Sequence, residues 1–132
     1  MNRTTLPIAL TLLLIAATIP HTIEDFRYGE FARFGVSTST AGVALVIVYA
    51  VQLIGMILAV RGERSGFWLL AACGVLWCVG ASIVHGSELF GSGAYRNGFE
   101  SKALIVAIIV LGAATAVVSL RSGRDLSRPP RH

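Results

Sequence analysis

Residues 6–26, LPIALTLLLIAATIPHTIEDF, decide the fold that this chain can adopt. A helix that rises about 1.5 Å per residue needs about 20 residues to cross about 30 Å of hydrocarbon, which matches this stretch. Three further apolar stretches of similar length follow at 41–60, 67–89 and 103–120. The sequence therefore predicts an all-α membrane protein, with four transmembrane helices in a single domain that covers residues 1–132.

The composition excludes several other classes of protein. Hydrophobic residues make up 55% of the 132 residues and charged residues only 14%, whereas soluble domains carry about 25% charged residues. This balance disfavours a soluble enzyme, a disordered chain and a collagen-like repeat. The net charge is +4, but the basic residues do not form the stripe that binds nucleic acid. We therefore expect membrane lipid, and no nucleic acid, as a partner.

The basic residues predict the orientation in the membrane. If both termini share one side, that side carries seven basic residues, Arg3, Arg61, Arg64, Arg121, Arg124, Arg128 and Arg131. The other side carries four, Arg27, Arg33, Arg96 and Lys102. The positive-inside rule then places both termini in the cytoplasm of a bacterial-type inner (plasma) membrane, with residues 121–132 as a basic cytoplasmic tail.

Two nine-residue segments at the ends of the first and third spans resemble each other. Residues 21–29 read HTIEDFRYG and residues 85–93 read HGSELFGSG, so His, Glu, Phe and Gly recur at the same four positions. An aromatic, arginine and glycine cluster follows each copy, FARFG in one and YRNGF in the other. The spans therefore look like two tandem helical hairpins, related by a pseudo-twofold axis along the membrane normal. Since cleavage would separate the first copy from its helix, we expect the first span to be retained rather than removed as a signal peptide.

The repeat brings together residues that carry chemistry. Positions i and i+3 lie about 60° apart on a helix, so each His shares a face with its Glu. Charged groups in the apolar layer normally pair inside the bundle. We therefore expect a buried cluster near the outer leaflet that contains His21, Glu24, His85 and Glu88, with Asp25, Glu30 and Glu100 as additions from its mouth.

Four roles are open for this cluster on the residues alone. It can be a structural hydrogen-bond network that fixes helix packing. It can bind a divalent transition metal through His21, Glu24, His85 and Glu88, although di-metal bundles use Glu before His. It can be a general acid–base centre for an apolar substrate, since an imidazole titrates near neutrality. A proton relay or transport path would use the same groups.

Two cysteines lie in the third span and add little chemistry. Cys73 and Cys78 are five residues apart and point about 140° apart on a helix, which disfavours a disulfide or a metal site. Gly74, Cys78 and Ser82 recur every four residues and predict a groove that another helix can approach closely.

The segment HTIEDFRYGEFARFG resembles the HXXEE family of small integral membrane proteins, whose first-helix motif is H-x-x-E-E. The matching residues are His21, Glu24 and Asp25, then His85 at the end of the third span, then Tyr95 and Gly98. Two departures are Asp25 in place of the second Glu and Asn97 where the family would have Pro. The family is largely uncharacterised, so the resemblance implies a fold and a site without a reaction.

These observations lead to one expectation of function and one alternative. The chain is expected to bind a small lipophilic molecule or a metal and to do acid–base chemistry of the isomerase, hydratase or cyclase type. The catalytic candidates are His21, Glu24, Asp25, His85 and Glu88. The alternative is a structural or proton-transporting membrane protein. Whether the chain is an enzyme and whether it forms homo-oligomers are left open.

Overall fold

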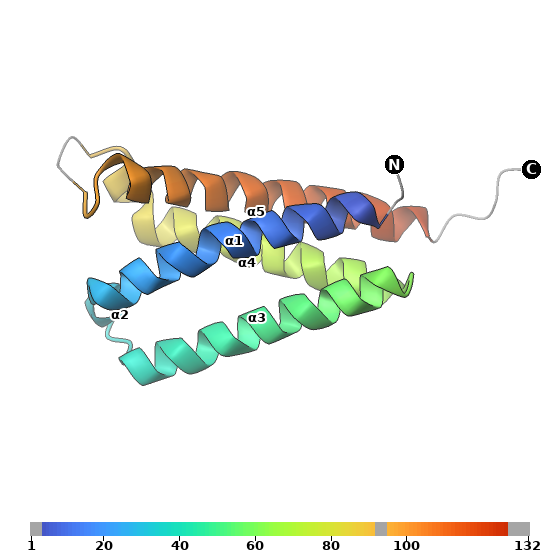
Figure 1. Ribbon diagram of the computed structural model, residues 1–132, viewed down its shortest axis with the longest axis horizontal. Coiled ribbons are helices and arrows are strands. Elements are labelled where there is room, and N and C mark those ends of the chain that lie inside the picture. The colour runs from blue at the N-terminus through green and yellow to red at the C-terminus, as the bar shows by residue number, and fades with distance from the viewer. Residues whose placement is uncertain (1–3, 92–94, 127–132) are drawn as a thin grey trace, which may run out of the picture.

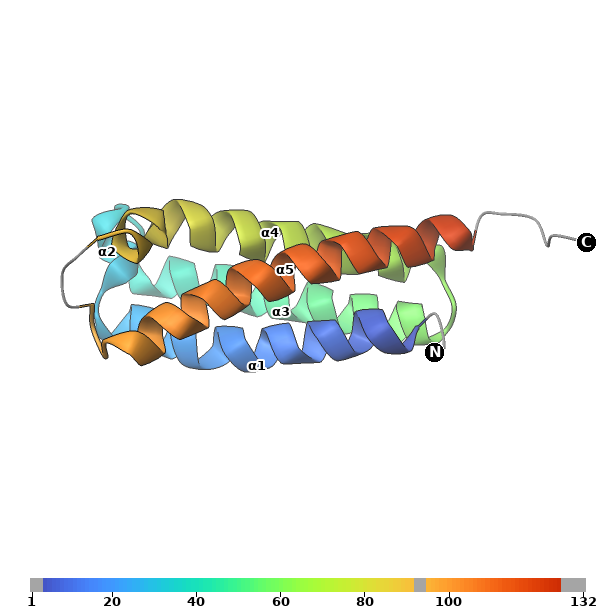
Figure 2. The ribbon, with the colours of Figure 1, turned by 90° about the horizontal axis from the view of Figure 1, so that it is seen from above.

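All the elements of the computed structural model, which describes residues 4–91 and 95–126, are helices. They are α1 (Thr5–Arg27), α2 (Glu30–Arg33), α3 (Thr38–Val60), α4 (Arg64–Leu89) and α5 (Phe99–Asp125). The long helices run side by side and alternate in direction (Figures 1 and 2). The start of α1 and the end of α5 therefore lie at the same end of the bundle, and the short α2 lies at the other end.

Four long apolar helices are present, one at each of the four predicted apolar stretches, and they fit a multi-pass membrane protein. Each is long and apolar enough to cross a membrane. Their outward faces carry large apolar side chains, such as Val46 at 68% and Ile83 at 74% exposed. Inside the bundle lie polar residues such as Gln52 and Thr115, each fully buried. Soluble monomers rarely expose apolar surface on this scale, so the outer surface suits hydrocarbon better than water.

The helices extend further than the apolar stretches that predicted them. Helix α3 begins at Thr38, because the Ser37 hydroxyl caps it by accepting a 3.1 Å hydrogen bond from the Thr40 N–H. Helix α5 continues to Asp125, so the first part of the predicted tail is helical, and residues 127–132 lie outside the described residues. Hydropathy marks only the apolar centre of a helix, whereas its backbone hydrogen bonds continue into polar turns.

Helices α4 and α5 form the closest helix pair. A Cβ atom added to Gly74 would lie 2.6 Å from the carbonyl oxygen of Gly112, and one added to Gly112 would lie 2.8 Å from that of Gly74. The two backbones therefore touch where only glycine fits. The predicted small-residue groove is present at Gly74 and Cys78, whereas Ser82 is exposed and bonds to its own helix. Both cysteines are free.

Helices α3 and α4 are in close contact near the turn that joins them, but a cavity separates α1, α3 and α4 towards α2. Near the turn between α3 and α4, Gly66 lies directly against the backbone of Gly55 and Ala59. Further along, the indole N–H of Trp77 donates to Gln52 Oε1 at 3.0 Å. Beyond this level, towards α2, the facing side chains of the three helices line a cavity. The two predicted hairpins thus pack differently, since α4 and α5 are in close contact whereas α1 and α3 meet at few points.

Candidate functional site

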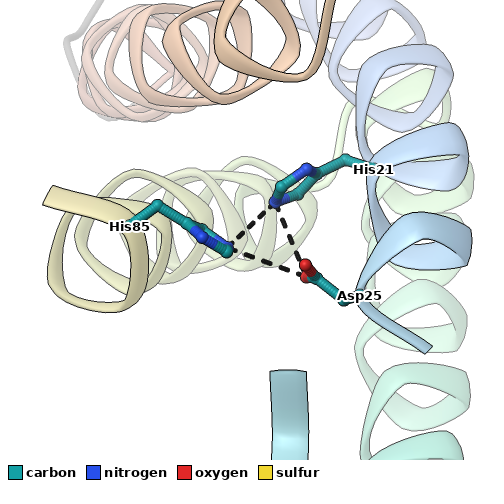
Figure 3. A group of neighbouring side chains, drawn as sticks. All are labelled: His21, Asp25 and His85. Atoms are coloured by element: carbon teal, nitrogen blue, oxygen red, sulfur yellow. Dashed lines mark hydrogen bonds and ion pairs between the residues drawn. The ribbon is translucent and has the colours of Figure 1, made fainter. Parts of the chain in front are cut away.

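Three buried side chains converge at the α2 end of the bundle. The Nε2 atoms of His21 on α1 and His85 on α4 lie 3.1 Å apart. Asp25 Oδ2 lies 3.5 Å from the first of these nitrogens and 3.7 Å from the second. All three residues are less than a tenth exposed. Figure 3 shows the two rings and the carboxylate pointing at one another across the gap between α1 and α4.

Helix geometry turns Asp25 and Glu24 to opposite sides of His21, and the helices on those sides decide which acid meets the two imidazoles. Residues four apart on a helix are offset by about 40°, so Asp25 lies on the same side of α1 as His21. Glu24 is turned about 100° away from Asp25 and faces α5 instead. There its carboxylate accepts hydrogen bonds from Asn97 Nδ2 at 2.7 Å and from Ser101 Oγ at 2.8 Å. The expected place of Glu24 in the cluster is thus occupied by Asp25.

His85 and Glu88 contact each other, as their spacing on the helix predicts. His85 Nδ1 lies 3.0 Å from Glu88 Oε2, three residues further along α4. Because a carboxylate only accepts hydrogen bonds, we assign the proton of neutral His85 to Nδ1. Its Nε2 then carries a lone pair, which can accept a hydrogen bond from His21 Nε2–H. The hydrogen bonds form a chain from His21 through His85 to Glu88, whose side chain is 19% exposed.

Two arginines hold the acids of this cluster. Arg96 donates to Asp25 and Glu30, and Arg33 donates to Glu30 and Glu88, each at 2.6 Å. The acid of α1 is thus held by the segment between α4 and α5, and the acid of α4 is held by α2. The Arg96 side chain is only 6% exposed, whereas that of Arg33 is 56% exposed. Arg96 also has a positive φ of 33°, a backbone conformation that residues other than glycine rarely adopt.

Tyr95 completes the surroundings of His85. Its hydroxyl lies 3.1 Å from His85 Nδ1, and the residue is buried. Burial raises the pKa of this phenol above its usual value, although Arg96 acts in the opposite direction. Burial would also lower the pKa of Arg96, but Asp25 and Glu30 outweigh this, so that it lies above its usual value. At neutral pH the segment therefore presents a protonated phenol and a charged guanidinium to the cluster.

Of the two other acids that were expected at the mouth of the cluster, one joins it and one does not. Glu30 is buried and joins the cluster through the two arginines. Glu100 is exposed and does not join it. Gly93 of the second repeat copy lies outside the described residues. Sequence reasoning missed the roles of Arg33 and Arg96, although both belong to the repeated aromatic, arginine and glycine clusters, and buried carboxylates need partner cations.

A cavity of about 320 Å³ adjoins the cluster. His21, Asp25, Glu30 and His85 lie in its wall, and almost all of the remaining wall is apolar. The apolar wall includes, from α3 and α4, Ala41, Leu45, Val48, Leu76, Trp77 and Val84. An apolar chamber with a few polar groups in its wall is the usual form of a small-molecule site.

Fold and site together define a class, a helical bundle that fits a multi-pass membrane protein and carries a buried His/Asp/Glu cluster beside an apolar cavity. No protein-family model, no curated protein and no solved structure matches the chain. The likeness to the HXXEE family therefore stays a prediction from its motif.

Proposed function

We propose that this chain is an integral protein of a bacterial-type inner membrane, which binds a small lipophilic molecule and transfers protons to or from it. The observation that carries the proposal is the apolar cavity with His21 and His85 in its wall. An apolar molecule gains by leaving water for such a wall, and an imidazole at the wall can act as acid or base. This combination suits isomerisation, hydration or cyclisation.

The hydrogen-bond chain supports the proton-transfer part of the proposal. A proton taken from the bound molecule by one imidazole can pass along the His21–His85–Glu88 chain. Glu88 is partly exposed near the end of α4, so it can exchange protons with water. The site can therefore return to its starting protonation state after each reaction.

The arrangement of charges supports the proposed orientation, with both termini cytoplasmic and the cluster near the outer leaflet. Of the four basic residues at the α2 end, Arg33 and Arg96 are neutralised by acids of the cluster. Arg61, Arg64, Arg121 and Arg124 lie towards the other end, where α1 begins and α5 ends. The sequence assigns seven basic residues to that side and four to the α2 side, and this difference favours a cytoplasmic location for that end.

The proposed repeat also draws support from the arginines. Each half of the chain supplies an arginine to the acid of the other half, Arg33 to Glu88 and Arg96 to Asp25. The repeat relates Glu88 to Glu24 and Arg33 to Asn97, so the hydrogen bond from Asn97 to Glu24 is the twofold counterpart of the Arg33–Glu88 ion pair, whereas the Arg96–Asp25 ion pair has no counterpart. We therefore retain the pseudo-twofold axis, and the HXXEE resemblance that includes both histidines, as parts of the proposal.

A structural role is the second candidate, and the same arginines favour it. Arg96 ties α1 and α2 to the segment before α5, so the network also holds the cavity end together. Transport of protons across the whole membrane is less well supported. One turn below the histidines, Ala17 and Ala81 pack with Leu14 and Ile108 in an apolar layer.

Binding can be tested through Trp77, which lies in the cavity wall. Trp68→Phe removes the only other tryptophan and leaves Trp77 as the reporter. We expect a brominated long-chain alcohol to quench Trp77 fluorescence in protein reconstituted in nanodiscs. Gly80→Leu should reduce this quenching several-fold, because Gly80 lines the cavity, a Cβ atom added there meets nothing within 4 Å, and the rest of the side chain would then occupy cavity space.

Gly86→Leu is the matched control. Gly86 lies on the same helix and also has open space around it, but it is not among the residues that line the cavity. It should leave the quenching close to that of the parent. Equal quenching in the parent and both leucine variants would mean that the alcohol reaches Trp77 only from bulk lipid, and binding in the cavity would be rejected.

Proton transfer requires a second measurement on the natural ligand. Molecules that copurify with the wild type but are depleted in Gly80→Leu would be extracted and returned to the protein in D₂O. We expect a carbon-bound proton of the ligand to exchange for deuterium, as seen by mass spectrometry, and the rate to fall at least about 100-fold in His85→Gln. Unchanged exchange with a lowered melting temperature would favour the structural role.

A further inference from the structure

We propose that His21, Asp25 and His85 together bind one divalent first-row transition-metal ion, with a coordination position that faces the apolar cavity. The ligand atoms are His21 Nε2, His85 Nε2 and Asp25 Oδ2. This inference rests on the ligand-binding part of the proposed function, because the metal would serve the same cavity. A bound ion would take both Nε2 atoms and replace the hydrogen bond between the two histidines, so that a metal-bound water, and not a free imidazole, would then exchange the proton with the ligand. It changes the ligand set that the sequence suggests, since Asp25 replaces Glu24 and Glu88.

The spacing of the three ligand atoms carries the proposal. They form a triangle with sides of 3.1, 3.5 and 3.7 Å. In a tetrahedral site with metal–ligand bonds of about 2.0–2.1 Å, neighbouring ligand atoms lie about 3.3–3.4 Å apart. An ion near the centre of the triangle would therefore be at bonding distance from all three atoms. By contrast, Asp25 Oδ2 lies beyond ordinary hydrogen-bond distance from both nitrogens.

The hydrogen bonds of these residues leave their proposed ligand atoms available to a metal ion. Glu88 accepts from Nδ1–H of His85, which leaves Nε2 with its lone pair, and such carboxylate–histidine pairs commonly support metal sites. Arg96 holds Asp25 by Oδ1 and leaves Oδ2 for the ion. His21 Nδ1 has no hydrogen-bond partner among the described residues, so no contact there prevents His21 from offering its Nε2 lone pair.

Charge also favours a cation at this place. Asp25, Glu30 and Glu88 carry three negative charges, whereas Arg33 and Arg96 carry two positive ones. The network thus has an excess of negative charge before an ion binds. All of these acids except Glu88 are buried, which strengthens their attraction for a cation.

A second set of metal-ligating groups lies nearby but is less suitable. Glu30, His85 and Glu88 bring their ligand atoms within 4.8 Å of one another. However, one nitrogen of Arg33 already lies 2.6 Å from a carboxylate oxygen of both Glu30 and Glu88. A guanidinium between these two acids repels a second cation, so the geometry points to one metal ion and not two.

The type of site follows from its donors. Two imidazoles and one carboxylate suit Zn²⁺, Fe²⁺, Mn²⁺ or Co²⁺, and sites with three protein ligands usually keep a position for water or substrate. His21, Asp25 and His85 all line the cavity, so a polar group of a lipophilic molecule can reach that position. The bound oxygen of an alcohol, carbonyl or water would be polarised there.

Metal binding is tested on the whole chain in detergent after chelator treatment. We expect stoichiometric binding of Zn²⁺ in a calorimetric titration, and visible absorption bands of four- or five-coordinate Co²⁺ when Co²⁺ is added instead. X-ray absorption of the Zn²⁺ form should show two imidazoles with nitrogens at about 2.0 Å. These readouts use the wild type and do not depend on whether a variant folds.

The decisive variants are neighbours on one helix turn. Asp25→Asn should weaken Zn²⁺ binding at least about 100-fold, whereas Glu24→Gln should change it by less than about threefold, because Glu24 faces Asn97 and Ser101. Glu88→Gln should weaken it about 10–100-fold through His85. Circular dichroism melting would identify any variant that fails to fold.

Two results would overturn the inference. One is wild-type protein that neither retains Zn²⁺ nor gives Co²⁺ bands. The other is loss of the metal in Glu24→Gln but not in Asp25→Asn, which would restore the ligand set suggested by the sequence. If Zn²⁺ does not bind but the brominated alcohol still quenches Trp77, only the metal is rejected. If Zn²⁺ binds but the alcohol does not, the cavity proposal fails while the metal site stands.

Discussion

The two halves of the chain follow one sequence plan but fold into different structures. In the second half, α4 and α5 touch through Gly74 and Gly112, with no room for a Cβ atom. In the first half, α1 and α3 contact each other at few points, and a cavity of about 320 Å³ lies beside them. The cavity thus adjoins the loosely packed pair and not the tightly packed one, although α4 also lines it. Two segments with similar sequences can therefore lie in different surroundings.

The histidines show the same contrast in detail. His85 is held by Glu88 of its own motif copy and by Tyr95. His21 is not bonded to Glu24 of its own copy, and it meets His85 and Asp25 instead. Each half also supplies an arginine to an acid of the other half. The side chain of Arg96 is buried, whereas that of Arg33 is largely exposed. The first half therefore depends on a buried ion pair, and the second on an exposed one.

The largest expected effect comes from removing the buried arginine. Arg96→Met leaves the carboxylates of Asp25 and Glu30 buried without their shared partner, which should cost about 3–5 kcal/mol of stability. Unfolding by added SDS in mixed micelles measures this loss. Arg96→Lys should fall between the wild type and Arg96→Met, since one ammonium group cannot reproduce two separate guanidinium contacts.

Arg33→Met is the matched test of the other half. Because the Arg33 side chain is 56% exposed and its charge is screened by solvent, its loss should destabilise the protein much less than the loss of Arg96. If both methionine variants lost the same stability, the greater burial of Arg96 would not make its ion pairs contribute more than those of Arg33. A larger loss for Arg33→Met would reverse the comparison.

Alanine substitutions at glycine should separate the tight half from the open half. Gly74→Ala and Gly112→Ala each force a Cβ atom against the backbone of the facing helix, and we expect each to cost about 1–3 kcal/mol. Gly80→Ala on α4 meets nothing within 4 Å, so it should be neutral or stabilise the helix by up to about 1 kcal/mol. Thermal unfolding in detergent would rank the stabilities of the three variants. A loss at Gly80 as large as that at Gly74 would contradict the open packing at the cavity.

Tyr95→Phe should have a smaller effect than Arg96→Met. Tyr95→Phe removes one hydrogen bond to His85 and should cost about 0.5–1.5 kcal/mol at neutral pH. Because the pKa of Tyr95 lies above that of an unfolded tyrosine, its contribution is complete below about pH 10 and is lost as the pH rises further. The wild type should therefore lose stability more steeply than Tyr95→Phe above about pH 10. Parallel pH profiles for the two proteins would show that the phenol is not held in its protonated form.

Much of the fold could be predicted from the apolar stretches. Their lengths alone indicate four spans, and the structure differs mainly at the ends, where Ser37 caps α3 and polar residues extend α5. The four-residue helix α2 was not predicted, because four residues are too few to show a hydrophobic period and the helix depends on tertiary contacts of Glu30 and Arg33.

The candidate site could be predicted only in part. Both histidines were found, since a polar residue in an apolar span is conspicuous and each stands at the same place in a repeat. Residue spacing could not predict that Asp25 rather than Glu24 contacts the histidines, because positions i+3 and i+4 both lie near the face of His21. Only the position of α4 on one side of α1 and α5 on the other separates the two acids.

The sequence by itself determined that the chain forms four long apolar helices, and that its few polar residues gather at two helix ends. This follows from local properties, the length of each stretch and the cost of polar groups in an apolar layer. The tertiary structure alone decided which acid meets the histidines, which arginine is buried and where a cavity remains. Those outcomes depend on the rotation and separation of whole helices, which arise from contacts between residues far apart in the chain.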